Sequence, residues 1–336
     1  MYQLEAPSLT GSTRQEIINE FWGDNAPSVA KSTQDDCYFE YLENQCRLAR
    51  QNDHTQQLCT LRNICDIVRH CKEGTTREEI KADLALKSGD SGKELKPYMD
   101  NAIDLAVRLW LMVHVGKLPR GVTGQSTLKW EQGNLRATIN EQFQHQLILT
   151  DSVKFEKVFN LRNVERIADV KIQWTPNLID HLKFNEDGKK PVLNVFHHAT
   201  ILKYHEKSTI FPQGLVSETL RTLALLLPSH DKTTRKWFAP YLMQLRLDPA
   251  ALTCGQLKLE ERQIDHFKFW HDRLVVLKQY FDDSQPRTIK QWWFDDRKRV
   301  QWFWVAIVLV VCTVLFGIIQ CIEGGWQIYK AYYPRV

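Results

Sequence analysis

The stretch WFWVAIVLVVCTVLFGIIQCI, residues 302–322, decides how this chain is organised. It carries no charged residue, and only Thr313 and Gln320 interrupt the apolar run. As a helix it would span about 32 Å, close to the roughly 30 Å hydrocarbon core of a bilayer. The alternative is a buried core helix, which normally carries the polar stripe that this run lacks. The run therefore predicts one membrane-spanning helix, with the lipid bilayer as its partner.

The charges on either side of this run predict its orientation. Two basic residues follow the run, and five precede it: Arg287, Lys290, Arg297, Lys298 and Arg299. Basic residues favour the cytosolic side, so we expect a cytosolic N-terminal body. Only 14 residues follow Ile322, which predicts tail-anchored insertion. The length of the run does not separate the endoplasmic reticulum from the plasma membrane, because helix tilt absorbs small mismatches.

Aromatic and basic residues on both sides of the run predict where the helix meets the lipid headgroups, because amphipathic rings favour that layer. The predicted membrane-interface residues are Trp292, Trp293, Arg297, Lys298, Arg299, Trp302, Trp304, Trp326, Tyr329 and Lys330. Gly317 would allow close packing of two such helices, so homo-oligomerisation stays an open alternative.

The composition of the whole chain is that of an ordinary soluble protein. Of 336 residues, 43% are apolar and 25% are charged, and the net charge is +4. These values exclude a disordered chain, a collagen-like chain and a polytopic membrane protein. No extended basic block indicates a nucleic-acid partner. The eight cysteines form no C-x-x-C pair, and a zinc site at Cys65, His70 and Cys71 lacks a fourth ligand, so we expect reduced thiols, no metal and no cofactor.

Breaks in the sequence pattern predict an α+β protein with several segments. They are a loose N-terminal arm (1–35), a mostly helical, winged-helix-like domain (36–145), a mixed α/β domain (146–285), a juxtamembrane segment (286–301), the transmembrane helix (302–322) and a short tail (323–336).

The winged-helix prediction rests on the order of elements in the first domain. Helical patterns end at Gly74 and at Gly89, a longer helix runs from about Lys93 to Val115, and alternation around Gly133-Asn134 suggests a hairpin. Such a fold can place its third helix in a DNA groove. Asp100 and Asp104 on the polar side of that helix would repel phosphates, so we expect an interaction or packing module.

The second domain is predicted to mix strands and helices. Residues 170–174 and 192–198 have the pattern of strands, and residues 214–228 and 259–281 that of helices. His197, His198 and His205 form a candidate cluster. Adjacent strand residues point to opposite faces, so at most one of His197 and His198 is expected to face a site with His205.

Several strings of the second half together resemble a large family of fungal proteins with one C-terminal membrane segment. The strings are WTPNLIDHL (174–182), VFHHA (195–199), LVSETLRTLALLLP (215–228), RKWF (235–238), VQW (300–302) and GIIQCIEGGWQIYKA (317–331). The resemblance implies a cytosolic globular body ahead of a membrane anchor. It implies no activity and no catalytic residue.

Three functions are compatible with the sequence. The favoured one is a non-enzymatic, tail-anchored protein whose body binds an unidentified cytosolic or membrane protein. The second is a cryptic enzyme that uses a polar cluster of Asp180, His181 and His198, with Asp180 orienting a histidine base; no G-x-S-x-G, P-loop or dinucleotide motif supports it. The third is a membrane-active effector of a fungal self/non-self type, against which the lack of a polar stripe counts.

Overall fold

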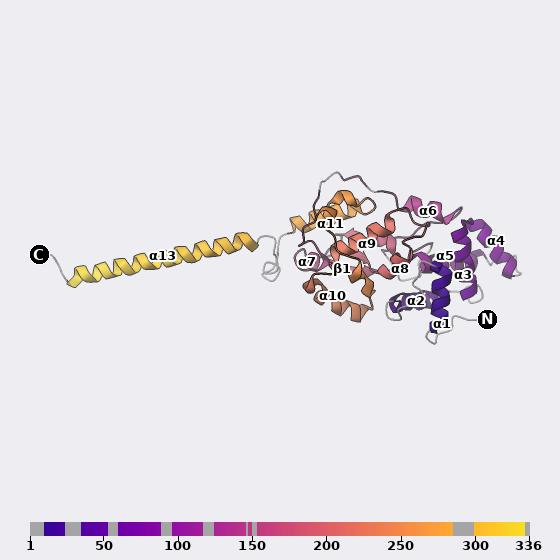
Figure 1. Cartoon of the computed structure of the whole chain (residues 1–336), viewed down its shortest axis with the longest axis horizontal. Coiled ribbons are helices and arrows are strands. Elements are labelled where there is room, and N and C mark those ends of the chain that lie inside the picture. The colour runs from indigo at the N-terminus through magenta and orange to yellow at the C-terminus, as the bar shows by residue number, and fades with distance from the viewer. Residues whose placement is uncertain are drawn as a thin grey trace. The chain divides into compact units, whose positions relative to one another are not determined.

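The computed structural model describes residues 10–23, 35–52, 60–88, 96–116, 124–145, 147–149, 153–284 and 299–332. These residues form two units, one that ends at Ser284 and one that contains the C-terminal helix α13 (Arg299–Tyr332). The first unit, here called the body, has α+β architecture with a small sheet among its helices (Figure 1). The body is one compact unit, so the expected division into two domains near residue 145 is wrong.

Helices build the N-terminal part of the body. They are α1 (Gly11–Trp22), α2 (Asp36–Asn52), α3 (Leu61–Glu73), α4 (Arg77–Ser88), α5 (Lys96–Leu111) and α6 (Leu135–Gln142). The prediction of a loose arm is wrong for α1, because Ile17, Ile18, Phe21 and Trp22 are buried in the core. These four side chains recur on one helical face, a signal that the surrounding Pro, Ser and Thr residues obscured.

The turns between these helices follow the local sequence. Gly74 ends α3, as expected, in the left-handed conformation with φ of 83°. The capping box of α4 is formed by Thr76 and Glu79. The Glu79 carboxylate accepts from the Thr76 backbone N–H at 2.8 Å.

Helix α5 is the centre of this part of the body. It packs against α2, α3 and α4, and its apolar side chains from Ala102 to Leu111 are at most 2% exposed. They are Ala102, Ile103, Leu105, Ala106, Val107, Leu109, Trp110 and Leu111. Its buried Asp104 accepts from Arg77 Nη1 at 2.8 Å, which pairs the two buried charges. The third helix of the predicted winged-helix domain is thus enclosed by the protein.

The hairpin predicted around Gly133-Asn134 is wrong. Asn134 is instead the N-cap residue of α6, and its side-chain oxygen accepts from the Arg136 backbone N–H at 2.7 Å. Asparagine competes well for this role, because its short side chain satisfies a free N–H of the first helical turn. A helix therefore stands where the wing of a winged-helix domain was expected.

A three-stranded sheet organises the rest of the body. Strand β1 (Lys171–Thr175) is parallel to β3 (Val192–Phe196), and β2 (Phe184–Asn185) is antiparallel to β3 on its other side. Both longer strands confirm the sequence prediction, although β3 ends two residues early, before His197 and His198.

Helices and short turns surround this sheet. The α-helices are α7 (Leu161–Arg166), α8 (Ala199–Tyr204), α9 (Leu215–Leu226), α10 (Lys232–Leu245) and α11 (His271–Asp283). Helix α9 confirms the prediction for 214–228. The helix predicted for 259–281 begins only at His271, and two 3-10 turns precede it (Glu260–Arg262 and Ile264–His266). Ile264 and Phe267 are buried, and their backbone is irregular and not that of an α-helix.

Candidate functional sites: the apolar helix and two polar clusters

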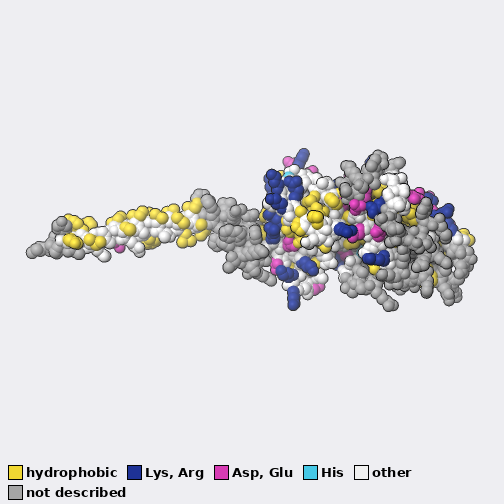
Figure 2. Space-filling model, turned by 90° about the horizontal axis from the view of Figure 1, so that it is seen from below, with side chains coloured by type: hydrophobic (Ala, Val, Ile, Leu, Met, Phe, Trp, Pro, Cys, Tyr) yellow, Lys and Arg dark blue, Asp and Glu magenta, His cyan; other side chains and the backbone are white. Residues whose placement is uncertain are grey.

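Helix α13 is the one helix of the described residues that is long and apolar enough to cross a membrane. Its apolar segment, Val305–Lys330, has no residue buried inside the structure. Large apolar side chains such as Val308, Leu309 and Phe316 are 58%, 63% and 67% exposed. In Figure 2 apolar side chains follow the visible length of this helix, whereas charged groups are spread over the described surface of the body.

The helix continues beyond the expected end of the span at Ile322. It runs through Glu323, Gly324 and Gly325 and ends at Tyr332, so most of the predicted short tail is helical. Two glycines do not stop a helix whose following residues still favour it. The 26 residues of Val305–Lys330 would extend about 39 Å, somewhat more than a bilayer core of roughly 30 Å.

Some of the predicted membrane-interface residues lie on this helix. Trp326 and Tyr329 are 62% and 61% exposed, and Lys330 Nζ lies 6.0 Å from the centre of the Trp326 ring. The remaining predicted positions lie outside the described residues: Trp292, Trp293, Arg297 and Lys298, together with the side chains of Arg299, Trp302 and Trp304.

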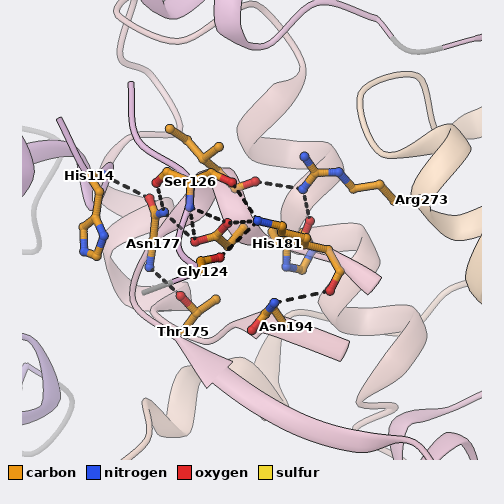
Figure 3. A network of polar contacts seen from close by, with 11 residues as sticks. His114, Gly124, Ser126, Thr175, Asn177, His181, Asn194 and Arg273 are labelled. Carbon is orange, nitrogen blue, oxygen red and sulfur yellow. Dashed lines mark hydrogen bonds and ion pairs between the residues drawn. The ribbon is translucent and has the colours of Figure 1, made fainter. Parts of the chain in front are cut away.

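The first polar cluster surrounds Asp180, which is 2% exposed at the end of the 3-10 turn Leu178–Asp180 (Figure 3). Its carboxylate accepts from the Ser126 backbone N–H at 3.0 Å and from Asn177 Nδ2 at 2.8 Å. The Asn177 side chain also accepts from the His114 backbone N–H at 3.0 Å and donates to the Ser126 carbonyl at 2.8 Å. Asp180 and Asn177 therefore join the residues after α5 to the turn after β1.

His181, the next residue, has both ring nitrogens engaged. Nδ1 accepts from the Phe196 backbone N–H at 3.2 Å, so Nε2 carries the proton and donates to Thr222 Oγ1 at 2.7 Å. The ring is fully buried against Trp270, with ring centres 4.9 Å apart. Burial, and next the positive charge of Arg273, lower the pKa of His181 to about 3. A neutral imidazole with no free nitrogen is held as a structural group and cannot take a proton from a substrate.

The structure does not assemble the polar cluster predicted from Asp180, His181 and His198. Among the described residues, no hydrogen bond or ion pair joins any two of these three side chains. Asp180 bonds toward Ser126, and His181 bonds toward Thr222. His198 belongs to a second cluster.

The second polar cluster brings His198 together with His197 and Cys37. Cys37 Sγ lies 3.5 Å from His198 Nδ1 and 3.9 Å from His197 Nδ1. The two imidazole rings have centres 4.1 Å apart. The expectation that the histidines face opposite ways is wrong, because β3 ends at Phe196 and His198 is already the N-cap residue of α8. Strand alternation does not apply beyond the end of the strand.

The histidines of this cluster are buried and neutral, and the cysteine borders solvent. Burial lowers the pKa of His197 to about 3; burial, and next the neighbouring His197, lower that of His198. Burial, and after it the charges of Asp248 and Glu40, raise the pKa of the Cys37 thiol. Cys37 lines a cleft of about 440 Å³ that is also bordered by Arg14, Asp36, Glu40, Glu43, Leu242, Arg246, Leu247 and Pro249.

Cys37 was not identified as a site residue because its partners lie 160 positions away along the chain. Spacing rules detect ligands supplied by one local motif, and this cluster joins the first turn of α2 to the end of β3. The only available signal was the adjacent pair His197-His198 at the predicted end of a strand. The third histidine considered with them, His205, lies elsewhere, with Nε2 2.9 Å from the Trp22 indole nitrogen.

Comparison with known proteins adds no relative: no family model, no curated protein and no solved structure matches this chain. The resemblance to fungal membrane-anchored proteins stays a prediction from the quoted motifs.

Proposed function

We propose that this is a single-pass membrane protein, anchored by α13, whose body binds another protein at the membrane surface. The observation that carries the proposal is that no residue of the apolar segment Val305–Lys330 is buried inside the structure. At about 25 cal/mol per Å² of apolar surface, an uncovered helix of this kind is strongly unfavourable in water, and lipid covers it without a protein partner.

The orientation in this proposal comes from the sequence on either side of the helix. Five basic residues (Arg287, Lys290, Arg297, Lys298 and Arg299) precede the run 302–322, and two (Lys330 and Arg335) follow it. This excess supports a cytosolic body in our proposal. Among the described residues of the body, Cys37, Cys65, Cys71 and Cys254 form no disulfide, which is compatible with a reducing compartment.

The proposed mechanism is confinement at a membrane surface. An anchor restricts the body to a thin layer next to the bilayer and raises its effective concentration toward other proteins in that layer. We therefore propose that the partner is itself bound to the membrane. The helices of the predicted winged-helix region serve as a packing module in this proposal, because α5 is enclosed by its neighbours. An enclosed α5 cannot enter a DNA groove, so the proposed partner is a protein and not a nucleic acid.

Two lysines in the middle of the span test the anchor. The double variant Val311→Lys/Leu315→Lys places two charges where each costs about 2.5–3.5 kcal/mol of insertion free energy. We expect the full-length wild-type chain to stay in the membrane pellet after extraction with carbonate at high pH, and the double variant to be released. The matched control Val311→Leu/Leu315→Ile keeps the segment apolar and should stay in the pellet. Release of the wild-type chain would refute the anchor.

Proximity labelling tests the partner separately. A biotin ligase fused to the N-terminus of the full chain should label cytosolic domains of membrane proteins, and the Val311→Lys/Leu315→Lys form of the same fusion should lose that set. If both forms label the same proteins, the anchor does not select the partner and confinement is wrong.

A further inference from the structure

We propose that Cys37, His197 and His198 form a metal site that binds one zinc-type divalent ion, with the fourth coordination position open to the neighbouring cleft. One ligand atom of each residue lies within 4.8 Å of the others, and this is the one such group among the described residues. The proposal does not depend on the membrane anchor.

The distances match those that a tetrahedral ion requires. Bonds of about 2.3 Å to sulfur and about 2.0–2.1 Å to nitrogen at tetrahedral angles separate a sulfur and a nitrogen ligand by about 3.6 Å. The observed separations from Cys37 Sγ are 3.5 Å to His198 Nδ1 and 3.9 Å to His197 Nδ1. Both sulfur–nitrogen separations therefore lie within a few tenths of an ångström of the tetrahedral value.

The chemistry of the three donors also suits such an ion. Imidazole nitrogen together with thiolate sulfur is a donor set typical of zinc sites, whereas calcium and magnesium prefer oxygen. An imidazole nitrogen without a proton offers its lone pair to such an ion. On binding, the Cys37 S–H bond breaks, its electron pair forms the bond from sulfur to the metal, and the proton leaves to solvent.

The surroundings hold the donors in place and favour a cation. The His197 ring packs against Trp174 and the His198 ring against Tyr41, with ring centres 6.5 Å and 5.8 Å apart. The negative charges of Asp248 and Glu40 repel a Cys37 thiolate that has no metal beside it. The same charges attract a cation to the site. The Asp248 backbone N–H donates weakly to His197 Nδ1, at 3.4 Å, and the ion would replace this long contact.

Access to the site comes from the side of the cysteine. Cys37 is partly exposed and lines the cleft of about 440 Å³, whereas His197 and His198 are 7% and 2% exposed. Three protein ligands with an open fourth position are typical of zinc sites that bind water or a further ligand, and closed structural sites use four.

A cysteine–histidine nucleophile is the main alternative, and the same surroundings oppose it. Such a dyad needs a stabilised thiolate beside a protonated histidine. Here the thiolate is disfavoured by burial and by two carboxylates, and the histidines resist protonation. A divalent ion is compatible with both properties of the cluster. It stabilises the Cys37 thiolate by its positive charge, and it binds the neutral histidines where a proton would otherwise have to bind.

Cobalt substitution tests the site in the full chain, purified in detergent with a reductant and stripped of metal by a chelator. We expect one Co²⁺ per chain, a thiolate-to-cobalt charge-transfer band, tetrahedral d–d bands, and displacement of cobalt by Zn²⁺. Cys37→Ser should abolish the charge-transfer band, and Cys37→Ser and His198→Gln should each weaken binding more than about 100-fold, since loss of an outer-shell partner alone costs about 10–100-fold. The matched control is Cys254→Ser. Cys254 is partly exposed, as Cys37 is, and its replacement should keep the band.

Several outcomes would overturn the proposal. They are no charge-transfer band at saturating cobalt in the wild-type chain, a band that persists in Cys37→Ser, or a band that Cys254→Ser removes. A second measurement needs no variant: Zn²⁺ should slow alkylation of Cys37 relative to Cys254, as quantified by mass spectrometry of the wild-type chain. Equal slowing at both cysteines, or none at Cys37, would refute the site even if Cys37→Ser does not fold.

Discussion

Helices α5 and α13 are both apolar, but their surroundings are opposite. Ile103 and Val107 on α5 are fully buried among α2, α3 and α4, whereas Val308 and Leu315 on α13 are 58% and 54% exposed. The polar groups show the same difference. Asp104 on α5 has a buried ionic partner in Arg77, while the run from Val305 to Ile322 contains no charge to pair.

This comparison teaches that apolar composition alone does not say what covers a helix. Helix α5 keeps charged residues because the body supplies partners for them, and those partners fix how it packs. Helix α13 keeps none, because hydrocarbon offers no partner for a charge. The experiments below break or sharpen this comparison, from the largest expected effect to the smallest.

A lysine at the centre of α5 should have the largest effect. Ile103→Lys buries a charge without a partner, and we expect it to lower the free energy of unfolding of the body by about 4 kcal/mol or more. The same change on α13, Val308→Lys, should leave unfolding of the body unchanged and weaken retention in the membrane. Thermal unfolding followed by circular dichroism, with membrane fractionation of the same samples, measures both effects.

Leu86→Lys is the control for this comparison, because Leu86 on α4 is 83% exposed. It should change the free energy of unfolding by less than about 0.5 kcal/mol. If Ile103→Lys were as mild as Leu86→Lys, the enclosure of α5 would be wrong.

A methyl group beside α5 should have an intermediate effect. Gly116 has φ of 67°, and a Cβ there would lie 1.9 Å from Asp104 Oδ2. Gly116→Ala therefore combines backbone strain with displacement of the buried Asp104 carboxylate, and we expect it to cost about 2–4 kcal/mol of unfolding free energy. Denaturant unfolding of the full chain in detergent measures the loss.

Gly124→Ala separates the two causes. Gly124 also has a positive φ, of 80°, but a Cβ there meets nothing within 4 Å. It should cost about 1–2 kcal/mol, from backbone strain alone. Equal losses in the two variants would show that the contact with Asp104 contributes nothing.

Acid should give a gradual effect, smaller per pH unit than the loss in Gly116→Ala, and in the body only. The folded-state pKa of His181 is depressed to about 3, so its neutral form contributes stability that is fully present above the unfolded pKa of about 6.5. As the pH falls below 6.5 the unfolded chain binds a proton that the folded chain does not, and stability is lost by at most about 1.4 kcal/mol per pH unit.

His181→Gln should reduce the acid slope by the share that His181 contributes, while His197 and His198 keep theirs, even though the variant is less stable at pH 7. Urea unfolding of both forms between pH 7 and pH 4.5 gives the two slopes, and membrane retention through α13 should not change over that range. Parallel curves for wild type and variant would show that His181 does not link protons to folding.

The sequence predicted those helices, strands and turns whose formation depends on neighbouring residues. The uncharged run at 302–322, the strands near 171–175 and 192–196, the helix at 215–226 and the glycine that ends α3 all follow from periodicity, length or turn chemistry. The errors occurred where two local signals compete. Gly133-Asn134 suits either a hairpin or a helix cap. The apolar residues before His271 fit the pattern of a helix, but they are equally compatible with the irregular turns that the structure has there.

The candidate site was less predictable than the fold for the same reason. His181 was noticed as a candidate base, yet its role depends on Phe196 and Thr222, which only the fold brings to its two ring nitrogens. Cys37 carried no signal of its own, because its partners belong to a distant strand end.

The sequence by itself determined that this chain has one uniformly apolar helix near its C-terminus and an α+β body before it, because length, charge and periodicity are properties of neighbouring residues. Only the tertiary structure decided that α5 is enclosed, that Asp180 and His181 are structural, and that Cys37 meets His197 and His198. Those outcomes depend on contacts between residues far apart in the chain, which the packing of the whole core selects and no local pattern encodes.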